Sequence, residues 1–291
     1  MIQAPKDRLI PASIAIPKPI KILAKTIQFF SHGLVTWFSS KLFSTPVKFP
    51  TPKREKMMWE SAQKSKLVID SLDCEIEVLT YGFSTKKVLL VHGWSGRSTQ
   101  LFMIADKLLE NGYMVISFDA PAHGNSQGKS SSMPEFVEAI HKIDSELGPF
   151  EAAVGHSLGG MSLYTAVAQG FDIKTMVSIG SGDTISAIIR NFIGNLEIKP
   201  KIADKMKKRF DKKLQVDIDD YSSSKQAKLV DIPALVIHDS FDGDVPVSCA
   251  YSIRQNLKNG SILITNGLGH TKILRDKNTT SRVVSFIKSN T

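Results

Sequence analysis

One stretch near the middle of the chain constrains the fold more than any other. Residues 152–154 are apolar, as in a buried strand, and residues 161–168 are small and apolar, as in a helix. Between them lies Gly-His-Ser-Leu-Gly-Gly, residues 155–160. Only glycine, which has no Cβ, fits beside so sharp a strand-to-helix turn. The pattern therefore predicts that Ser157 stands exposed at the carboxyl edge of a sheet.

The predicted turn also gives this serine a suitable electrostatic setting. The first turn of a helix has unpaired N–H groups and a partial positive charge, which stabilise a developing anion. The N–H of Leu158 is the first such donor. The segment His92-Gly93-Trp94 follows an apolar strand directly, so its backbone can approach the same point. We therefore predict an oxyanion hole formed by the N–H groups of Trp94 and Leu158.

Strand and helix patterns alternate over residues 67–291, which predicts an α/β fold with a mostly parallel sheet and helices on both faces. Fully apolar runs such as residues 88–91 indicate strands that are buried on both sides. The expected strands are 67–70, 75–79, 88–91, 115–118, 152–154, 176–179, 234–237 and 261–264.

No strand pattern occurs in residues 181–231, where two helices are expected instead, at 184–192 and 200–214. The second helix carries an apolar line at four-residue spacing, and its other faces are rich in lysine. We predict a small helical cap that turns its apolar side towards the site and its basic side towards solvent. The apolar line consists of Ile202, Met206, Phe210 and Leu214.

Residues 1–66 precede this domain and form an N-terminal extension. Apolar residues recur every three or four positions over 20–43, which predicts an amphipathic helix with Gly33 as a weak point. Charged and polar residues interrupt this stretch, so a transmembrane span is not expected, and no signal-peptide pattern is present. Two interpretations stay open: the helix packs on the main domain, or it contacts a membrane surface peripherally.

The net charge of +9 raises the question of an acidic partner. No nucleic-acid motif accompanies this charge, so we predict no nucleic-acid partner. The two cysteines, Cys74 and Cys249, lie far apart and suggest neither a disulfide framework nor a metal site. No metal or other cofactor is therefore expected, and a cytoplasmic location fits.

A serine hydroxyl is a poor nucleophile at neutral pH and needs a base, which in turn needs a carboxylate to orient it. His270 is the preferred base, because its Gly-flanked loop follows a strand and comes last in the chain. Four further histidines adjoin strand ends, where supporting or pocket-lining positions are expected. They are His92, His123, His156 and His238.

Three acids compete to orient the base: Asp239, Asp242 and Asp244. Asp242 is favoured because it lies beyond the strand end and four residues before Pro246, and Asp244 is second.

Four segments together resemble the α/β-hydrolase superfamily, and the resemblance covers residues 67–290. It implies an eight-stranded sheet, a cap after the sixth strand and a triad of Ser157, Asp242 and His270 in that chain order. Many members have Gly where Ala122 stands, and Ala is nearly as small. The serine argues against the dehalogenase and epoxide-hydrolase branches, which use Asp there. The segments are His92-Gly93-Trp94, residues 119–126, residues 155–160, and residues 242–246 with Gly269-His270.

The expected activity is hydrolysis of a small-molecule carboxylic ester or thioester through an acyl-enzyme. Acyl transfer uses the same parts, with another nucleophile in place of water. A membrane-associated lipase-like enzyme that uses residues 20–43 as its anchor, and a binding module with an idle triad, are further alternatives.

Overall fold

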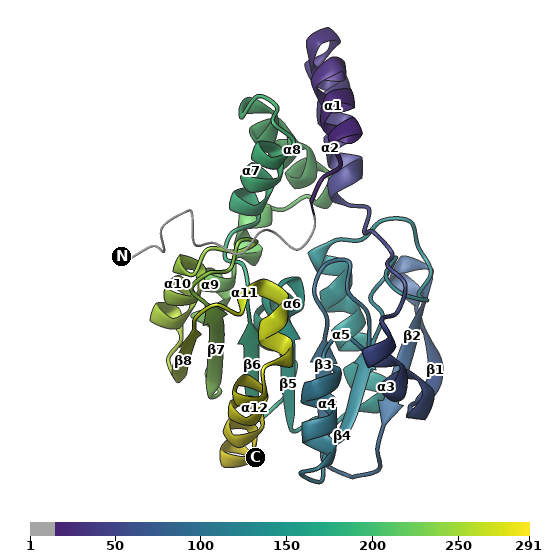
Figure 1. The fold of residues 1–291 in the computed structure, drawn as a ribbon, viewed down its shortest axis with the longest axis vertical. Helices are drawn as coiled ribbons and strands as arrows, with labels where there is room; N and C mark the ends of the chain where they lie inside the picture. Colours follow the sequence, from purple (N-terminus) through teal and green to yellow (C-terminus); the bar gives the residue numbers. More distant parts are fainter. Residues whose placement is uncertain (1–14) are drawn as a thin grey trace.

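The computed structural model describes residues 15–291, and residues 1–14 of the N-terminal extension lie outside the described residues. Its centre is an eight-stranded sheet in the order β1-β2-β4-β3-β5-β6-β7-β8 (Figure 1). β2 pairs antiparallel with β1 and β4, and every other pair is parallel. The predicted fold class is confirmed. The strands are β1 Gln63–Ile69, β2 Cys74–Tyr81, β3 Lys87–Val91, β4 Met114–Phe118, β5 Ala152–His156, β6 Thr175–Ile179, β7 Ala234–Asp239 and β8 Gly260–Thr265.

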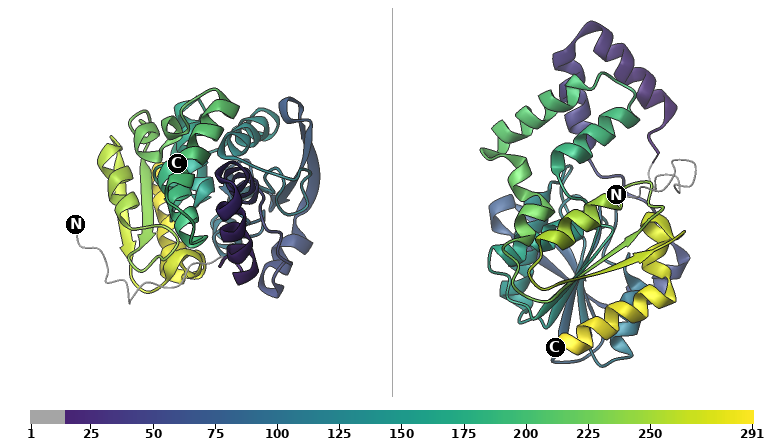
Figure 2. Two further views of the ribbon diagram at one scale, coloured as in Figure 1. Left: turned by 90° about the horizontal axis from the view of Figure 1, so that it is seen from above. Right: turned by 90° about the vertical axis from the view of Figure 1, so that its left-hand side faces the viewer.

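Helices cover both faces of the sheet, as the right-hand view of Figure 2 shows. Successive strand residues point to opposite faces, so Leu89 joins one core cluster and Leu90 the other. Helices α5, α6 and α10 cover the first face, and α3, α4 and α12 cover the second. The helices are α1 Lys18–Phe30, α2 His32–Phe43, α3 Lys56–Ser61, α4 Phe102–Leu109, α5 Met133–Leu147, α6 Leu158–Ala168, α7 Ile185–Asn195, α8 Lys201–Leu214, α9 Ser223–Ala227, α10 Ser248–Asn256, α11 Gly269–Lys272 and α12 Lys277–Asn290.

The edge strand β1 begins at Gln63 rather than at residue 67. Its first four side chains are exposed, so they show no apolar period, and only the backbone pairing with β2 defines them as a strand. Sequence patterning does not detect such a segment, because the pattern reports burial rather than hydrogen bonding.

Residues 20–43 form two helices, α1 and α2, where the sequence predicted one. The break lies at Ser31, not at Gly33. Ser31 is extended, with φ of −155° and ψ of 122°, and its hydroxyl accepts a hydrogen bond from the N–H of Leu34 at 3.2 Å. Serine is a preferred N-cap, so it ends one helix and begins the next. The pair stands above the sheet with its connecting turn at the far end of the molecule (Figure 1).

The two N-terminal helices pack on helices α7 and α8, which lie between β6 and β7 in the chain. Ala24 of α1 and Val35 of α2 are fully buried in one cluster with Ile202 and Met206 of α8. The apolar line of α8 therefore faces α1 and α2, which corrects the expectation that it faces the site. Helix α8 and the α1–α2 pair each have an apolar face, and packing these faces together removes both from water.

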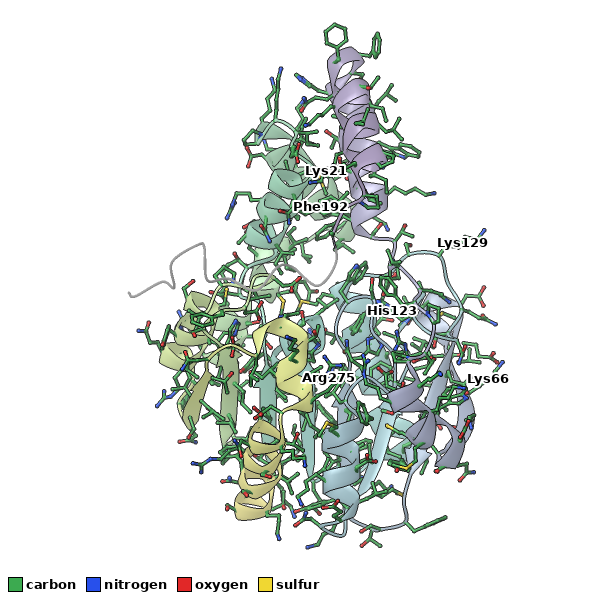
Figure 3. The ribbon with its side chains drawn as sticks, viewed as in Figure 1. Lys21, Lys66, His123, Lys129, Phe192 and Arg275 are labelled. Carbon is green, nitrogen blue, oxygen red and sulfur yellow. The ribbon has the colours of Figure 1, made fainter. Side chains whose placement is uncertain are left out.

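Aromatic contacts continue this cluster towards the sheet. Phe43, the last residue of α2, packs edge-on against Phe192 of α7, with ring centroids 5.2 Å apart, and lies 5.9 Å from Phe210 of α8. Lys21 of α1 and Phe192 are labelled at this junction in Figure 3. Within residues 15–291, no helix has the length and apolar character needed to cross a bilayer.

The shared apolar cluster predicts that a cavity within it destabilises the cap and the N-terminal helices together. Met206 is fully buried in it, so Met206→Ala should cost about 2–5 kcal/mol of local stability. The N-terminal helices and the cap should then be cleaved faster in limited proteolysis, with cut sites mapped by mass spectrometry. Leu229→Ala, at a side chain that is 62% exposed, is the control. Unchanged cleavage of the Met206 variant would contradict this packing.

Candidate active site

The turn after β5 has the strained geometry that the sequence predicts. Ser157 stands between β5 and α6 with φ of +52° and ψ of −118°, a backbone conformation that non-glycine residues rarely adopt. A Cβ on Gly155 would lie 2.6 Å from the backbone of Gly159, and one on Gly159 would meet the carbonyl oxygen of Val91. The two glycines thus let α6 begin directly against the central strands.

Ser157 and His270 lie at the same carboxyl edge of the sheet. The Ser157 N–H donates to the carbonyl of Ile179, at the end of β6, at 2.8 Å. The next residue, Gly180, has φ of +61° and lies against the His270 ring, where a Cβ would sit 3.2 Å from Nδ1. On the other side, His156 Nε2 is 3.0 Å from the carbonyl oxygen of His270.

The imidazole of His270 is bonded to the acid that the sequence favoured. His270 Nδ1 lies 2.7 Å from Asp242 Oδ2, and both side chains are buried. The other oxygen of Asp242 accepts the N–H groups of Asp244 and Val245 at 2.8 and 2.9 Å. A carboxylate held this way accepts from Nδ1–H, so the tautomer leaves Nε2 of His270 as the free base.

The electrostatics of the pair favour charge separation. Burial alone would raise the pKa of Asp242, but hydrogen bonds from His270 and the Val245 N–H, with the charges of His270 and His238, outweigh it and hold that pKa below its usual value. Burial alone would lower the pKa of His270, but its hydrogen bond to Asp242 and the nearby negative charges outweigh it, so the pKa is raised above 6.5. An imidazolium at residue 270 is therefore stabilised.

In the part of the chain that the structure describes, the other two candidate acids, Asp239 and Asp244, do not hydrogen-bond to the His270 ring, which is bonded to Asp242. Asp239 accepts the N–H groups of Phe241 and Leu268, both at 3.0 Å, and the hydroxyl of Thr265 at 2.7 Å. It therefore ties the loop after β7 to the loop after β8. Asp244 contributes its negative charge to the raised pKa of His270. Asp242, Asp244 and His270 offer ligand atoms within 4.8 Å of one another, but the facing atoms of two of them already share a hydrogen bond.

The segments that hold the two predicted oxyanion donors approach Ser157, since a Cβ on Gly93 would lie 3.0 Å from the Ser157 Cβ. Leu158 is the first residue of α6, and Trp94 lies in the turn after β3. Between residues 15 and 291, no protein group accepts the N–H of either residue. The loop is fixed by Gln100, whose Oε1 accepts the Gly93 N–H at 2.9 Å. No sequence pattern marks Gln100, which lies on the turn leading into α4.

His92 also holds the loop after β3 in place. Its Nε2 accepts the N–H of Ala120 at 3.0 Å, so its Nδ1 carries the proton and donates to the carbonyl of Gly93 at 2.7 Å. Burial lowers the pKa of His92 to about 4, so the ring stays neutral at physiological pH and keeps this tautomer.

The other three histidines at strand ends are also buried. His123 packs edge-on against Trp94, with ring centroids 5.1 Å apart. His238 Nε2 donates to the carbonyl of Val245 at 2.9 Å, beside Asp242. Burial lowers the pKa of His123 and His156 to about 3 and also lowers that of His238. The four histidines at strand ends are at most 2% exposed, and their hydrogen bonds and ring contacts hold the neighbouring loops in place.

The backbone at Ala122 is strained in a way that side-chain size does not reveal. Its φ is +65°, in the left-handed region, where a Cβ costs about 1–2 kcal/mol. The small size of alanine therefore explains why it fits the buried position, and the positive φ explains why glycine is common there.

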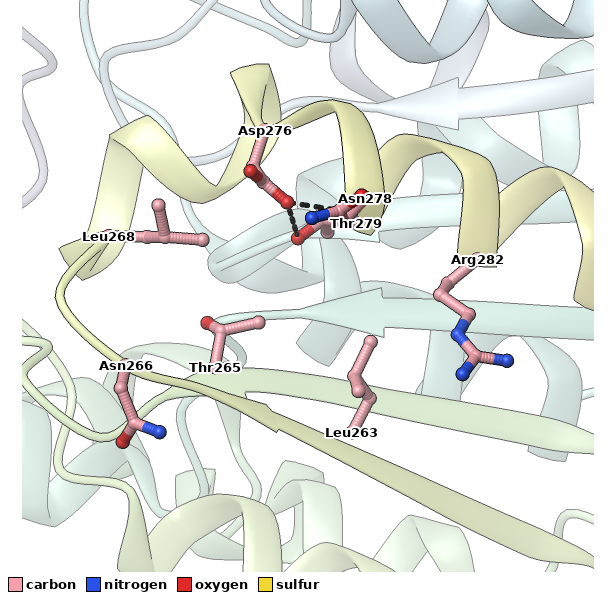
Figure 4. A pocket seen from close by; sticks show the side chains of 8 residues that line it. All are labelled: Leu263, Thr265, Asn266, Leu268, Asp276, Asn278, Thr279 and Arg282. Atoms are coloured by element: carbon pink, nitrogen blue, oxygen red, sulfur yellow. Dashed lines mark hydrogen bonds between the residues drawn. The ribbon is translucent and has the colours of Figure 1, made fainter.

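Two surface cavities lie beside the site rather than at it. The larger, of about 300 Å³, lies between β8 and the start of α12, where the Asp276 side chain caps the helix (Figure 4). The smaller, of about 220 Å³, lies between residues 48–51 and the loop after β3. Neither is lined by Ser157, Asp242 or His270.

A family model of the alpha/beta hydrolase fold matches residues 86–218, and one described as TAP-like protein matches residues 212–290. A search of curated proteins found no significant match.

Solved structures are similar in fold at low identity. A bacterial membrane phospholipase A is 17% identical, with TM-score 0.62, over 81% of this chain and 88% of that one. An esterase from Exiguobacterium antarcticum is 15% identical, with TM-score 0.61, over 78% and 100%. An esterase from Rhodococcus sp. is 18% identical, with TM-score 0.59, over 79% and 100%.

The close approach at the turn predicts the effect of one methyl group. In Gly159→Ala the new Cβ would press on backbone carbonyls that cannot yield, so we expect a loss of about 3 kcal/mol in unfolding free energy, measured in urea. Gly194→Ala is the matched control within α7. It has open space around it, so alanine should stabilise by about 0.5–1 kcal/mol. Equal midpoints for the two variants would contradict the steric explanation.

Proposed function

The chain belongs to the α/β-hydrolase superfamily, and we propose that it is a serine hydrolase that cleaves carboxylic esters or thioesters. One observation carries the proposal: the 2.7 Å hydrogen bond between His270 Nδ1 and Asp242 Oδ2, at the sheet edge that also bears the strained Ser157. A neutral imidazole fixed in this tautomer is the base that a serine nucleophile requires.

In the proposed reaction, His270 Nε2 takes the proton of the Ser157 hydroxyl as Oγ attacks the carbonyl carbon of the substrate. The carbonyl oxygen becomes an oxyanion, which the N–H groups of Trp94 and Leu158 stabilise. Asp242 stabilises the imidazolium that forms. The proton then passes from His270 to the leaving alcohol or thiol, and the C–O or C–S bond breaks to leave an acyl-Ser157.

Water completes the cycle by the same steps. His270 removes a proton from water as its oxygen attacks the acyl carbon, and the oxyanion again meets the two N–H groups. Collapse releases the carboxylic acid and returns the proton to Ser157. The names of the structural neighbours, two esterases and a phospholipase A, support ester chemistry as the class of reaction.

Replacement of the nucleophile tests the proposal directly. Ser157→Ala should lower kcat/KM for p-nitrophenyl esters by at least about ten thousandfold while the protein stays folded. A series of acyl lengths would show which chain the site prefers. Ser240→Ala is the control, because its hydroxyl lies at the same edge but bonds to Asn266. Unchanged turnover in the Ser157 variant would refute the assignment.

A fluorophosphonate probe separates the alternatives. The probe should label the wild-type protein at Ser157 and leave Ser157→Ala unlabelled, whereas an idle binding module would not react in either form. Product analysis in the presence of an added alcohol separates hydrolysis from acyl transfer, because a transferase would form a new ester instead of the free acid.

The raised pKa of His270 predicts the pH dependence. The base must be neutral, so kcat/KM should rise with pH through a midpoint above 6.5. Asp242→Asn removes the negative charge and the carboxylate hydrogen bond that contribute most to raising this pKa, so the midpoint should fall. The value of kcat should drop by roughly ten thousandfold. Asp244→Asn should move the midpoint in the same direction but by less, since the charge of Asp244 contributes least to the raised pKa of His270. An unmoved midpoint in Asp242→Asn would exclude His270 as the titrating base.

A further inference from the structure

We propose that the turn between α1 and α2 is a membrane-docking apex that binds an anionic phospholipid surface. The apex comprises the end of α1, the start of α2 and the beginning of α8 beside them. It lies at the end of the molecule farthest from the sheet (Figures 1 and 2). The proposal is independent of the catalytic one, because none of these residues belongs to the proposed active site.

The apex exposes large apolar side chains that the cap leaves uncovered. Phe29 and Phe30 end α1 with 85% and 77% of their surface accessible, and their rings stack edge-to-face at 5.3 Å. Leu34 and Trp37 on α2 are 59% and 51% exposed. The opposite faces of both helices are buried in the cap cluster, so this exposure is not a sign of an unfolded segment. Contiguous exposed aromatics of this kind mark an interaction surface.

Positive charge lies beside the apolar tip. The start of α8 packs against α2 in the cap cluster, so Lys199, Lys201 and Lys205 lie on that side of the turn. Their charges lower the pKa of His32, the first residue of α2, with Lys201 contributing most. The backbone N–H of Lys199 also donates to the side chain of Gln28 at 2.6 Å, beside Phe29. All three lysines are exposed.

The acidic residues of α1, the α7–α8 connection and the first turn of α8 are Glu197 and Asp204, and Glu197 is already paired. Glu197 accepts from Lys21 and Lys25 at 3.0 and 2.5 Å. The apex therefore presents aromatic rings beside a basic rim formed by Lys199, Lys201 and Lys205, the combination that places a helix at an anionic lipid interface. A second copy docked on the same surface would bring two lysine rims together, and their repulsion disfavours it.

Vesicle sedimentation of the full chain tests the proposal. The protein should bind vesicles of phosphatidylcholine and phosphatidylglycerol in equal parts, bind phosphatidylcholine alone more weakly, and lose affinity as salt increases. Phe29→Ser/Phe30→Ser should lower the partition coefficient at least about tenfold, because burial of one phenyl ring is worth about that factor. Phe83→Ser is the matched control, since Phe83 is fully exposed on a loop before β3.

Charge reversal tests the basic rim separately. Lys199→Glu/Lys205→Glu should weaken binding to the anionic vesicles at least about tenfold. Lys86→Glu/Lys228→Glu changes the net charge equally at exposed sites away from the apex and should have little effect. Absence of wild-type binding, or equal binding by the Phe29/Phe30 variant, would overturn the proposal. A concentration-dependent dimer that this variant abolishes would assign the apex to a second copy instead.

Discussion

The approach of α6 to the central strands is the constraint on which the site depends. A helix can begin this close to β3 and β5 only because Gly155 and Gly159 carry no Cβ. That proximity forces Ser157 into a positive φ and leaves the first N–H groups of α6 beside its hydroxyl. The strain of the turn, of order 1–3 kcal/mol, is sustained by the packed sheet around it.

Around this turn, the neighbouring loops are fixed by buried polar groups that do not titrate near neutral pH. His92 joins the loop after β3 to the loop after β4, and Asp239 joins the loops after β7 and β8. Gln100 holds the Gly93 N–H. Because buried donors and acceptors are costly to leave unpaired, these bonds fix several loops in one arrangement. The His270–Asp242 pair is thereby held in an already rigid frame.

The sequence predicted what depends on local pattern. Buried strands appear as apolar runs in the sequence. Ser157, Asp242 and His270 were each predicted in a loop after a strand, and the structure has them after β5, β7 and β8. Sequence patterning missed the features that depend on contacts with other parts of the chain. The break at Ser31 is an N-cap choice within an apolar period, and the direction of the apolar side of α8 depends on helices more than 150 residues away in the chain. Gln100 and the positive φ of Ala122 leave no pattern at all.

A short span of backbone joins helix α2 to the edge of the sheet that bears Ser157. From Phe43, where α2 ends, only a few residues lead to Val47, whose N–H donates to the Ser95 hydroxyl at 2.9 Å, one residue after Trp94. An extended chain gains at most about 3.5 Å per residue, so α2 cannot move far without pulling on that bond. Helices α1 and α2 are thus mechanically coupled to the loop after β3, and their removal would alter the structure at that edge of the sheet.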